Sequence, residues 1–252
     1  MNYLRGLGVV FSVWVSWNAT MIQEIQAAEV TAGTDIATAY VWRGITFNDE
    51  GVIQPSVTVT HPAGFAFNVW ANYDLGNFDD RLQDNDFSEV DLTFSYTLDL
   101  SPVSLTVGHI EYLFPNAGSD TATGEIYGSA GIELVEGITF TGAVYVDYDE
   151  VNDVYGTIGL SVDVGALVLK LPAPWSLSFS SSIGFAGREF VEAYGGEGSG
   201  AYDWNLGLTL GYAFNDSLSM SLFIRYVDNF DDEVLLEQEA DWYGGVGIYY
   251  SF

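Results

Sequence analysis

Charged residues stand at alternate positions in several segments of the 252-residue chain, and nearly all of them are acidic. In a β-strand, alternate residues share one face, so these side chains would lie together on a single surface. If the strands close into a barrel, that surface lines the interior. The expected pore-lining residues are Arg43, Glu89, Asp91, His109, Glu111, Glu125, Asp147, Asp203 and Arg225. Rings of Asp and Glu favour cations in a pore, which predicts a cation-preferring or neutral-solute channel.

Arg43 allows two roles among these carboxylates. As an isolated positive charge it could narrow the pore, and as a staple it could pair across the lumen with Glu89, Asp91 or Glu125. The staple is favoured because an arginine and a carboxylate can form two parallel hydrogen bonds. For any single lumen acid, bracing the wall is likewise favoured over a direct role in selectivity.

Catalytic chemistry finds little support in the same residues. A hydrolase needs a nucleophile and a base within hydrogen-bond reach of each other. His61 is expected in a turn, far from serines at the opposite end, and His109 has no adjacent serine on neighbouring strands. Glu111 and Glu125 could form a carboxylate pair, but so could many acids here. We therefore assign no catalytic residue and no cofactor.

Two acidic segments, residues 76–89 and 228–241, are expected in loops, and Arg81 is their one basic residue. Divalent cations are candidate partners there, free or bridging to lipopolysaccharide, because hard cations take carboxylate oxygens. No full calcium-loop spacing is present, so solvated loops are expected and no metal site is assigned. The chain has no cysteine, which excludes a disulfide or thiolate site, and its net charge of −29 excludes nucleic-acid binding through phosphates.

The elements that must position these residues are strands with strict alternation. From Tyr202 to Phe214 apolar residues occupy every second position, with aromatic residues at both ends and leucines between them, as in a strand that crosses a bilayer. The predicted fold class is all-β, a transmembrane up-and-down antiparallel β-barrel of about 12 strands. The predicted strands are residues 30–43, 51–61, 64–75, 88–99, 103–114, 124–135, 138–149, 153–164, 175–187, 201–214, 218–227 and 240–252.

The connections alternate between tight turns and longer acidic loops, and both ends of the barrel segment are expected on the short-turn side. The alternation slips at Gly108, which predicts a β-bulge that turns His109 and Glu111 inward. Residues 165–174 could extend the eighth strand or form a longer turn. No plug is expected, because strands and connections account for residues 30–252.

The ends of the chain indicate export to an outer membrane. Arg5, an apolar run at residues 7–17 and the small residues near 26–28 predict a signal peptide over residues 1–28. The barrel is then residues 29–252. The chain ends on Phe252 within an alternating strand, whose edge a closed barrel would pair. A secreted β-sandwich would also alternate, but it would not need aromatic residues at both ends of its apolar face.

Three short elements carry a family resemblance. They are Ala39-Tyr40-Val41-Trp42-Arg43-Gly44-Ile45-Thr46, Glu111-Tyr112-Leu113-Phe114-Pro115 and Glu125-Ile126-Tyr127. In this order, each at the top of a predicted strand, they resemble the TorF family of Gram-negative outer-membrane barrels, for which porin activity is presumed. The resemblance covers most of the first 150 residues and, more loosely, the rest. It implies an outer-membrane channel without established catalytic residues.

These observations predict a small passive porin in the cell outer membrane of a Gram-negative bacterium. Its surroundings would be outer-membrane lipid and lipopolysaccharide. A structural or adhesive barrel without an open pore is the main alternative, and an outer-membrane hydrolase is the weaker one. The sequence leaves the solute, the pore radius and the oligomeric state open.

Overall fold

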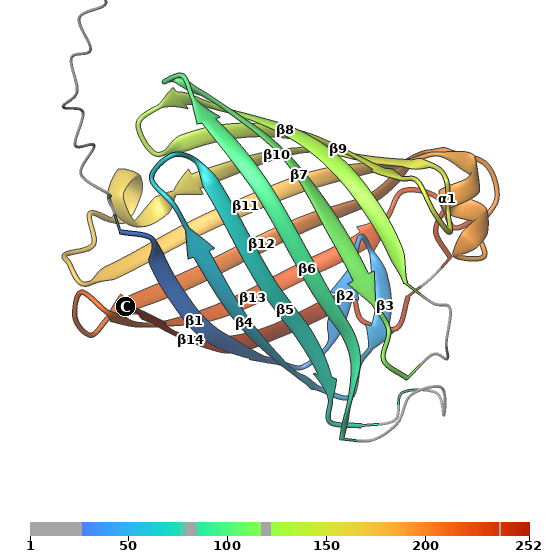
Figure 1. The fold of residues 1–252 in the computed structure, drawn as a ribbon, viewed down its shortest axis with the longest axis horizontal. Helices are drawn as coiled ribbons and strands as arrows, with labels where there is room; N and C mark the ends of the chain where they lie inside the picture. The colour runs from blue at the N-terminus through green and yellow to red at the C-terminus, as the bar shows by residue number, and fades with distance from the viewer. Residues whose placement is uncertain (1–26, 77, 79–84, 117–121, 237) are drawn as a thin grey trace, which may run out of the picture.

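A computed structural model describes residues 27–76, 78, 85–116, 122–236 and 238–252. Within these residues, twelve antiparallel strands form one closed barrel, each paired with its neighbours in the chain (Figure 1). The first barrel strand, β1, pairs with both β4 and β14 and so closes the sheet. The predicted fold class is confirmed. The barrel strands are β1 Glu29–Ala37, β4 Val52–Thr60, β5 Phe65–Asp74, β6 Asp86–Asp99, β7 Val103–Leu113, β8 Thr123–Val135, β9 Ile138–Asp147, β10 Val154–Asp163, β11 Trp175–Ala186, β12 Gly200–Ala213, β13 Leu218–Asn229 and β14 Trp242–Ser251.

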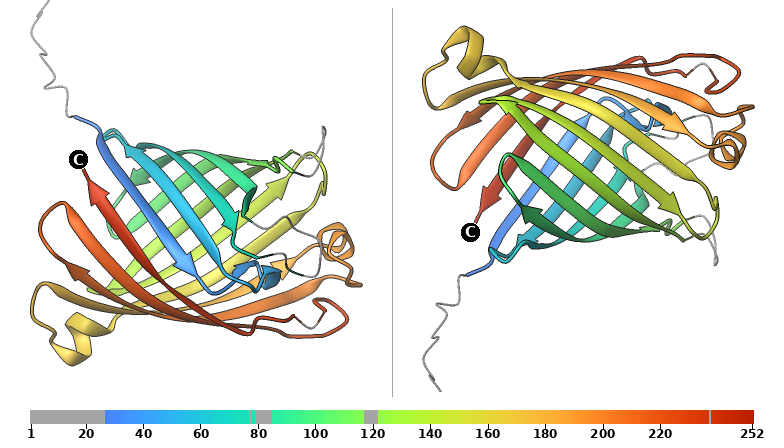
Figure 2. Two further views of the ribbon diagram at one scale, coloured as in Figure 1. Left: turned by 90° about the horizontal axis from the view of Figure 1, so that it is seen from below. Right: turned by 90° about the horizontal axis from the view of Figure 1, so that it is seen from above.

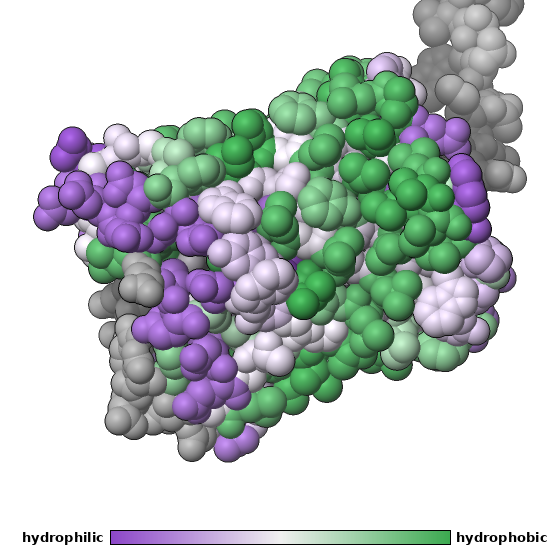
Figure 3. All heavy atoms as spheres, turned by 180° about the vertical axis from the view of Figure 1, so that it is seen from behind, coloured by the Kyte–Doolittle hydropathy of each residue, from purple (hydrophilic) through white to green (hydrophobic). Residues whose placement is uncertain are grey.

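The outer surface of the barrel is apolar. Val107 and Ile126 point outward and are 61% and 57% exposed, as are many other large apolar side chains of the strands. On the face drawn in Figure 3, hydrophobic residues form a broad area between hydrophilic residues at the two ends. Such exposure would be costly in water, and a lipid surrounding removes that cost.

The two ends of the barrel differ in their connections. At the turn end, short segments at residues 61–64, 100–102, 136–137 and 214–217 join the strands, and both β1 and β14 have their free ends there (Figure 1). Residues 165–174 also lie at the turn end and begin with a short π-helix, η2 (Gly165–Leu169), so they add no strand. The loop end carries the longer connections and the helix α1 (Arg188–Ala193). No helix among the described residues is both long and apolar enough to cross a bilayer.

A separate hairpin enters the barrel at the loop end. Strands β2 (Tyr40–Trp42) and β3 (Ile45–Asn48) pair only with each other and lie within the ring of barrel strands (Figure 2). Arg43 and Gly44 form the turn, with φ values of 49° and 81°, and a two-residue type I′ turn requires positive φ at both positions. The prediction of one strand over residues 30–43 is therefore wrong beyond Ala37. The prediction that nothing plugs the lumen is wrong as well.

The predicted bulge at Gly108 is absent, because β7 pairs in unbroken register with both β6 and β8. His109 lies opposite Phe94 and Ile126, which are 52% and 57% exposed on the outer face. His109 and Glu111 therefore face outward, and their assignment to the pore lining is wrong. His109 Nε2 lies 2.7 Å from the Tyr148 hydroxyl oxygen, so these polar groups satisfy one another near the loop end.

Candidate functional site

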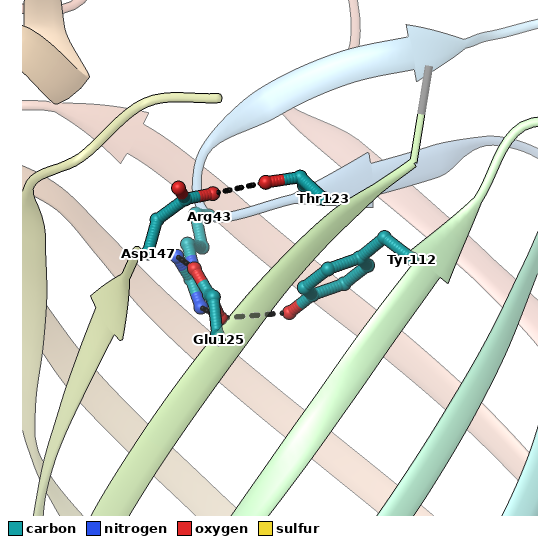
Figure 4. Close-up of polar contacts among 5 residues, drawn as sticks. All are labelled: Arg43, Tyr112, Thr123, Glu125 and Asp147. Atoms are coloured by element: carbon teal, nitrogen blue, oxygen red, sulfur yellow. Dashed lines mark hydrogen bonds and ion pairs between the residues drawn. The ribbon is translucent and has the colours of Figure 1, made fainter. Parts of the chain in front are cut away.

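The hairpin is tied to the barrel wall by a buried ion pair. Arg43 Nη1 and Nη2 donate to Glu125 Oε1 and Oε2 at 2.7 and 2.6 Å, and the two side chains are 7% and 4% exposed (Figure 4). The Tyr112 hydroxyl donates a third hydrogen bond to Glu125 Oε2 at 2.9 Å. The expected arginine staple is thus present, and its partner is Glu125. Because Arg43 occupies the tip of the hairpin, the pair joins the plug directly to β8.

Aromatic rings enclose the Arg43 guanidinium on its remaining sides. Its Cζ lies 4.3 Å from the ring centre of Trp42, 4.6 Å from that of Tyr145 and 4.4 Å from that of Tyr155. Cation–π attraction offsets part of the cost of removing the cation from water. Burial acts to lower the pKa of Arg43, but the hydrogen bond and the charge of Glu125 outweigh it and raise the pKa. Arg43 therefore stays charged where it is buried.

Further polar anchors hold the base of the hairpin. The Tyr40 hydroxyl donates to Glu89 Oε2 at 2.9 Å, and Asn48 Nδ2 donates to Asp74 Oδ1 at 2.6 Å. Both bonds are buried. Two lumen carboxylates thus bond with neutral hairpin groups, and sequence reasoning missed these groups because it searched for charged residues. The inward polar residues Asn72 and Asp74 on β5 and Glu89 and Asp91 on β6 were the available signal that groups inside the barrel must satisfy them.

Asp147 and Asp203 face inward and brace the wall. Asp147 accepts from the Thr123 hydroxyl at 2.7 Å and from three backbone N–H groups of the loop that follows β9, at 2.9 to 3.2 Å. Asp203 is fully buried and accepts from the Tyr155 hydroxyl at 2.8 Å and from Asn205 Nδ2 at 2.5 Å. Asp91 differs, because its buried Oδ1 has no hydrogen-bond partner among the described residues. The loop-end half of the lumen is thus crowded, and its mostly hydrogen-bonded carboxylates lie among the apolar and aromatic side chains that pack around the hairpin.

Arg225 occupies a different setting near the middle of β13. Its Nη1 donates to the carbonyl oxygens of Leu208 and Ile224 at 3.1 and 3.2 Å, and its Nη2 donates to Thr209 Oγ1 at 3.1 Å. Within the described residues, no carboxylate lies within 4.0 Å of it. Two cavities of about 370 and 350 Å³ border Arg225 and Tyr243, and we call them together the Arg225 chamber.

The chamber begins directly beneath the hairpin, where Ala39, Tyr40 and Val41 form part of its wall. The rest of the lining is rich in hydroxyl and amide groups with a few aromatic rings. The two cavities share Arg225 and Tyr243, and their other lining residues include Gln54, Trp70, Thr141, Ser161, Ser180, Ser182, Asn205, Thr209, Ser221, Phe223 and Tyr249. The chamber thus combines hydroxyl and amide groups with apolar side chains such as Leu160 and Leu206, and its charged lining residues are Arg225 and Asp35.

The acidic loops do not form a metal centre in the part of the chain that the structure describes. No group of three or more His, Asp and Glu side chains converges there. Of the acidic segment 76–89, residues 77 and 79–84 lie outside the described residues, and so does most of the predicted signal peptide. Divalent cations at these loops and the signal peptide remain predictions.

A match to a protein-family profile identifies the family of the chain. Residues 23–243 match the profile of a bacterial family of proteins of unknown function, Gcw_chp. The chain belongs to the Gcw_chp family. The TorF name finds no support in this match, although the barrel that it implied is present. No curated protein sequence matches this Gcw_chp protein significantly.

Solved structures similar to this Gcw_chp protein are outer-membrane channels. The KdgM porin in complex with disordered oligogalacturonate has a TM-score of 0.55 at 11% identity, over 89% of this chain and 99% of that one. The NanC porin has a TM-score of 0.50 at 10% identity, over 90% and 99%. An outer-membrane channel from Pseudomonas putida F1 has a TM-score of 0.55 at 9% identity, over 91% and 98%. At these identities the likeness establishes the fold alone.

Proposed function

We propose that this Gcw_chp protein is a porin-like channel of the bacterial outer membrane, through which small solutes diffuse passively. The observation that carries the proposal is the inverted distribution of polarity. The closed barrel is apolar outside, while its interior holds charged and hydroxyl groups around sizeable cavities. Its fold is also that of porins and outer-membrane channels.

The size of the barrel supports an aqueous path. Barrels of about eight strands are filled by side chains, and those of 16 to 18 leave an open channel, so twelve strands lie between these cases. Small residues such as Ser180, Ser182 and Gly207 face the chamber and leave room for water. The β2–β3 hairpin then forms the constriction, because it fills the loop-end half.

We infer that the loop end faces the cell exterior and the turn end the periplasm, as the short turns and the predicted signal peptide suggest. The acidic loops would then meet lipopolysaccharide, directly or through divalent cations. Export would follow from the N-terminal signal.

Selectivity would follow from the charge around the constriction. Glu89, Asp91, Glu125, Asp147 and Asp203 face the lumen there, and Arg43 neutralises one of them. The excess negative charge raises the local cation concentration and repels small anions. We therefore propose a preference for cations or neutral solutes.

Conductance measurements on the purified mature protein in a planar lipid bilayer test this function. We expect discrete channels whose reversal potential in a salt gradient favours cations. A reversal potential that favours anions would contradict the selectivity, and a complete lack of conductance would favour a structural or adhesive barrel.

The structure removes His109 as the candidate catalytic base of the hydrolase alternative. His109 faces outward, with its Nε2 3.7 Å from Glu111 Oε2, and so does not line the lumen. An esterase assay on the wild-type protein and on His109→Ala tests the alternative, and we expect no activity in either.

A further inference from the structure

We propose that the Arg225 chamber is a binding site for a solute that carries one carboxylate and several hydroxyl groups, such as a sugar acid. The proposal rests on the channel of the proposed function and not on its cation preference, because such a solute can reach the chamber from the turn end of the lumen without passing the acidic constriction at the loop end. It goes further by naming the chemical class that the interior recognises.

The position of the guanidinium is fixed by the barrel wall. Gly207 lies opposite Arg225 on β12, and a Cβ at Gly207 would come within 2.9 Å of Arg225 Cδ and 3.0 Å of Nη1. The missing side chain lets the arginine lie flat across β12, where two carbonyl oxygens and the Thr209 hydroxyl hold it. A guanidinium positioned in advance loses less conformational entropy when it binds a ligand.

Donors remain on this guanidinium for a ligand. A guanidinium has five N–H groups, and three hydrogen bonds to described residues are formed. Two donors therefore have no partner among the described residues, and the half-buried Arg225 borders both cavities of the chamber. Two N–H groups of one guanidinium match the two oxygens of a carboxylate.

Among the described residues, no carboxylate forms an ion pair with Arg225. Asp35 belongs to the same cavity wall, but the Tyr249 hydroxyl donates to its Oδ1 at 2.6 Å. The pairing of β1, β14 and β13 sets Asp35 level with Ser221, four residues from Arg225 on β13, or about 13 Å along the strand. Arg225 thus has no carboxylate paired with it, although Asp35 keeps a negative charge elsewhere in the same cavity wall, and a ligand carboxylate could pair with Arg225 at a distance from Asp35.

The rest of the chamber suits hydroxyl groups and a flat ring. Hydroxyls and amides of Ser180, Ser182, Asn205 and Ser221 can donate to and accept from an alcohol. Arg225 Cζ lies over the Phe223 ring at 5.2 Å from its centre, and the other aromatic rings that line the cavities include those of Trp70, Tyr243 and Tyr249. A carboxylate on Arg225, hydroxyls on the polar wall and a ring face on an aromatic side chain together describe a sugar acid. A dianion would add a second negative charge in a lumen that is acidic overall.

Binding is tested on the full mature protein in detergent by isothermal titration with D-glucuronate, D-glucose and inorganic phosphate. We expect glucuronate to bind about tenfold more tightly than glucose, because a hydrogen-bonded charge is gained. Arg225→Gln should lower glucuronate affinity about tenfold and leave glucose affinity unchanged. Equal binding of glucuronate and glucose, or tighter binding of phosphate, would overturn the proposal.

Arg188→Gln is the matched control, because it removes one positive charge from an exposed position on α1. It should leave glucuronate affinity unchanged. Gly207→Ala serves as a second variant that keeps the charge but displaces the guanidinium, and it should also weaken glucuronate binding. Heat-modifiable migration in electrophoresis reports whether each variant is folded. If the folded Arg225→Gln and Gly207→Ala variants both bind glucuronate as tightly as the wild type, the Arg225 chamber is not the binding site.

The same variants in a planar bilayer separate this site from the proposed function. We expect glucuronate to interrupt the current through the wild-type channel and to do so about tenfold less effectively in Arg225→Gln. Arg225-dependent binding without any conductance would refute the channel and leave the site standing. Conductance with binding that does not depend on Arg225 would refute the site and leave the channel standing.

Discussion

Arg43 and Arg225 both project into the lumen, yet their surroundings are opposite. Arg43 is 7% exposed, pairs with Glu125 through two hydrogen bonds and is enclosed by aromatic rings. Arg225 is half-buried, bonds only neutral oxygens and borders two cavities. A charge that is buried and paired becomes part of the structure, whereas one that is held in place but unpaired stays available to a solute. Paired side chains thus fill the loop-end half of the lumen, whereas the chamber leaves room for a solute.

Removing the plug should produce the largest change. Replacing residues 39–50 with a short Gly-Ser linker empties the loop-end half and leaves the twelve barrel strands in place. We expect single-channel conductance to rise several-fold, because the hairpin is the proposed constriction. Shortening the connection at residues 165–174, which lies at the turn end away from the hairpin, is the control. Unchanged conductance after hairpin removal would mean that the constriction lies elsewhere.

Breaking the buried pair should cost the most stability of any single substitution. Glu125→Ala leaves the Arg43 cation buried without its carboxylate, and losing one partner of such a pair typically costs about 3–5 kcal/mol. Urea unfolding of the protein in lipid vesicles, followed by tryptophan fluorescence, measures the effect. The double variant Arg43→Met, Glu125→Leu should recover much of the loss. If Arg225→Gln destabilises as much as Glu125→Ala, the contrast between the two arginines fails.

Losing one neutral anchor should have a smaller effect. Tyr40→Phe deletes the hydroxyl that donates to Glu89 and leaves that buried carboxylate without this partner, at a cost of about 1–3 kcal/mol. The same unfolding experiment measures it. Tyr249→Phe is the comparison in the chamber, because its hydroxyl donates to Asp35 in a more accessible setting. We expect the Tyr40 variant to lose more stability, and the reverse order would contradict a tightly anchored plug.

Neutralising the constriction should shift selectivity. In the variant Glu89→Gln, Asp91→Asn, Glu125→Gln, we expect the reversal potential in a salt gradient to move toward zero, since three lumen carboxylates are gone. Changing Glu189, Glu192 and Glu197 to Gln removes equal charge from the loop after β11 and is the matched control. A larger shift in the control would place selectivity in the loops.

An exposed ion pair should contribute least. The side chains of Arg188 and Glu192 on α1 lie 3.6 Å apart and are 64% and 55% exposed. Solvent screens such pairs, so Arg188→Ala should change the free energy of unfolding by less than about 0.5 kcal/mol. A loss of stability comparable with that of Glu125→Ala would show that an ion pair stabilises the protein by that amount even without burial.

Much of the barrel was predictable, because strand alternation is a local property. The segment Tyr202–Phe214, for example, coincides with β12 within two residues at its start and one at its end. The candidate site was predictable only in part. Arg43 was expected to reach Glu89, Asp91 or Glu125, and the structure selects Glu125. The neutral anchors Tyr40 and Asn48 carried no charge signal and were missed.

The errors share one cause, which is that the local sequence pattern does not show which residues meet across strands. His109 was placed inside because the apolar alternation slips at Gly108, which predicted a bulge, but strand pairing on both sides keeps the register unbroken. The hydrogen-bonding distance between His109 and Tyr148, which is 39 residues away, could not be read locally. Residues 38–43 were read as the end of the first strand and residues 44–50 as its connection to the next, although Gly44 suits the second position of a tight turn after Arg43.

The sequence by itself determined that this chain is a β-barrel of about twelve strands, because lipid on one side and water on the other impose a period of two along every strand. The tertiary structure alone decided that a hairpin fills one end of the lumen, that Arg43 is paired and that Arg225 is not. Those outcomes depend on groups that meet across the barrel, such as Arg43 and Glu125, which are 82 residues apart. Contacts of that kind form only when the sheet closes.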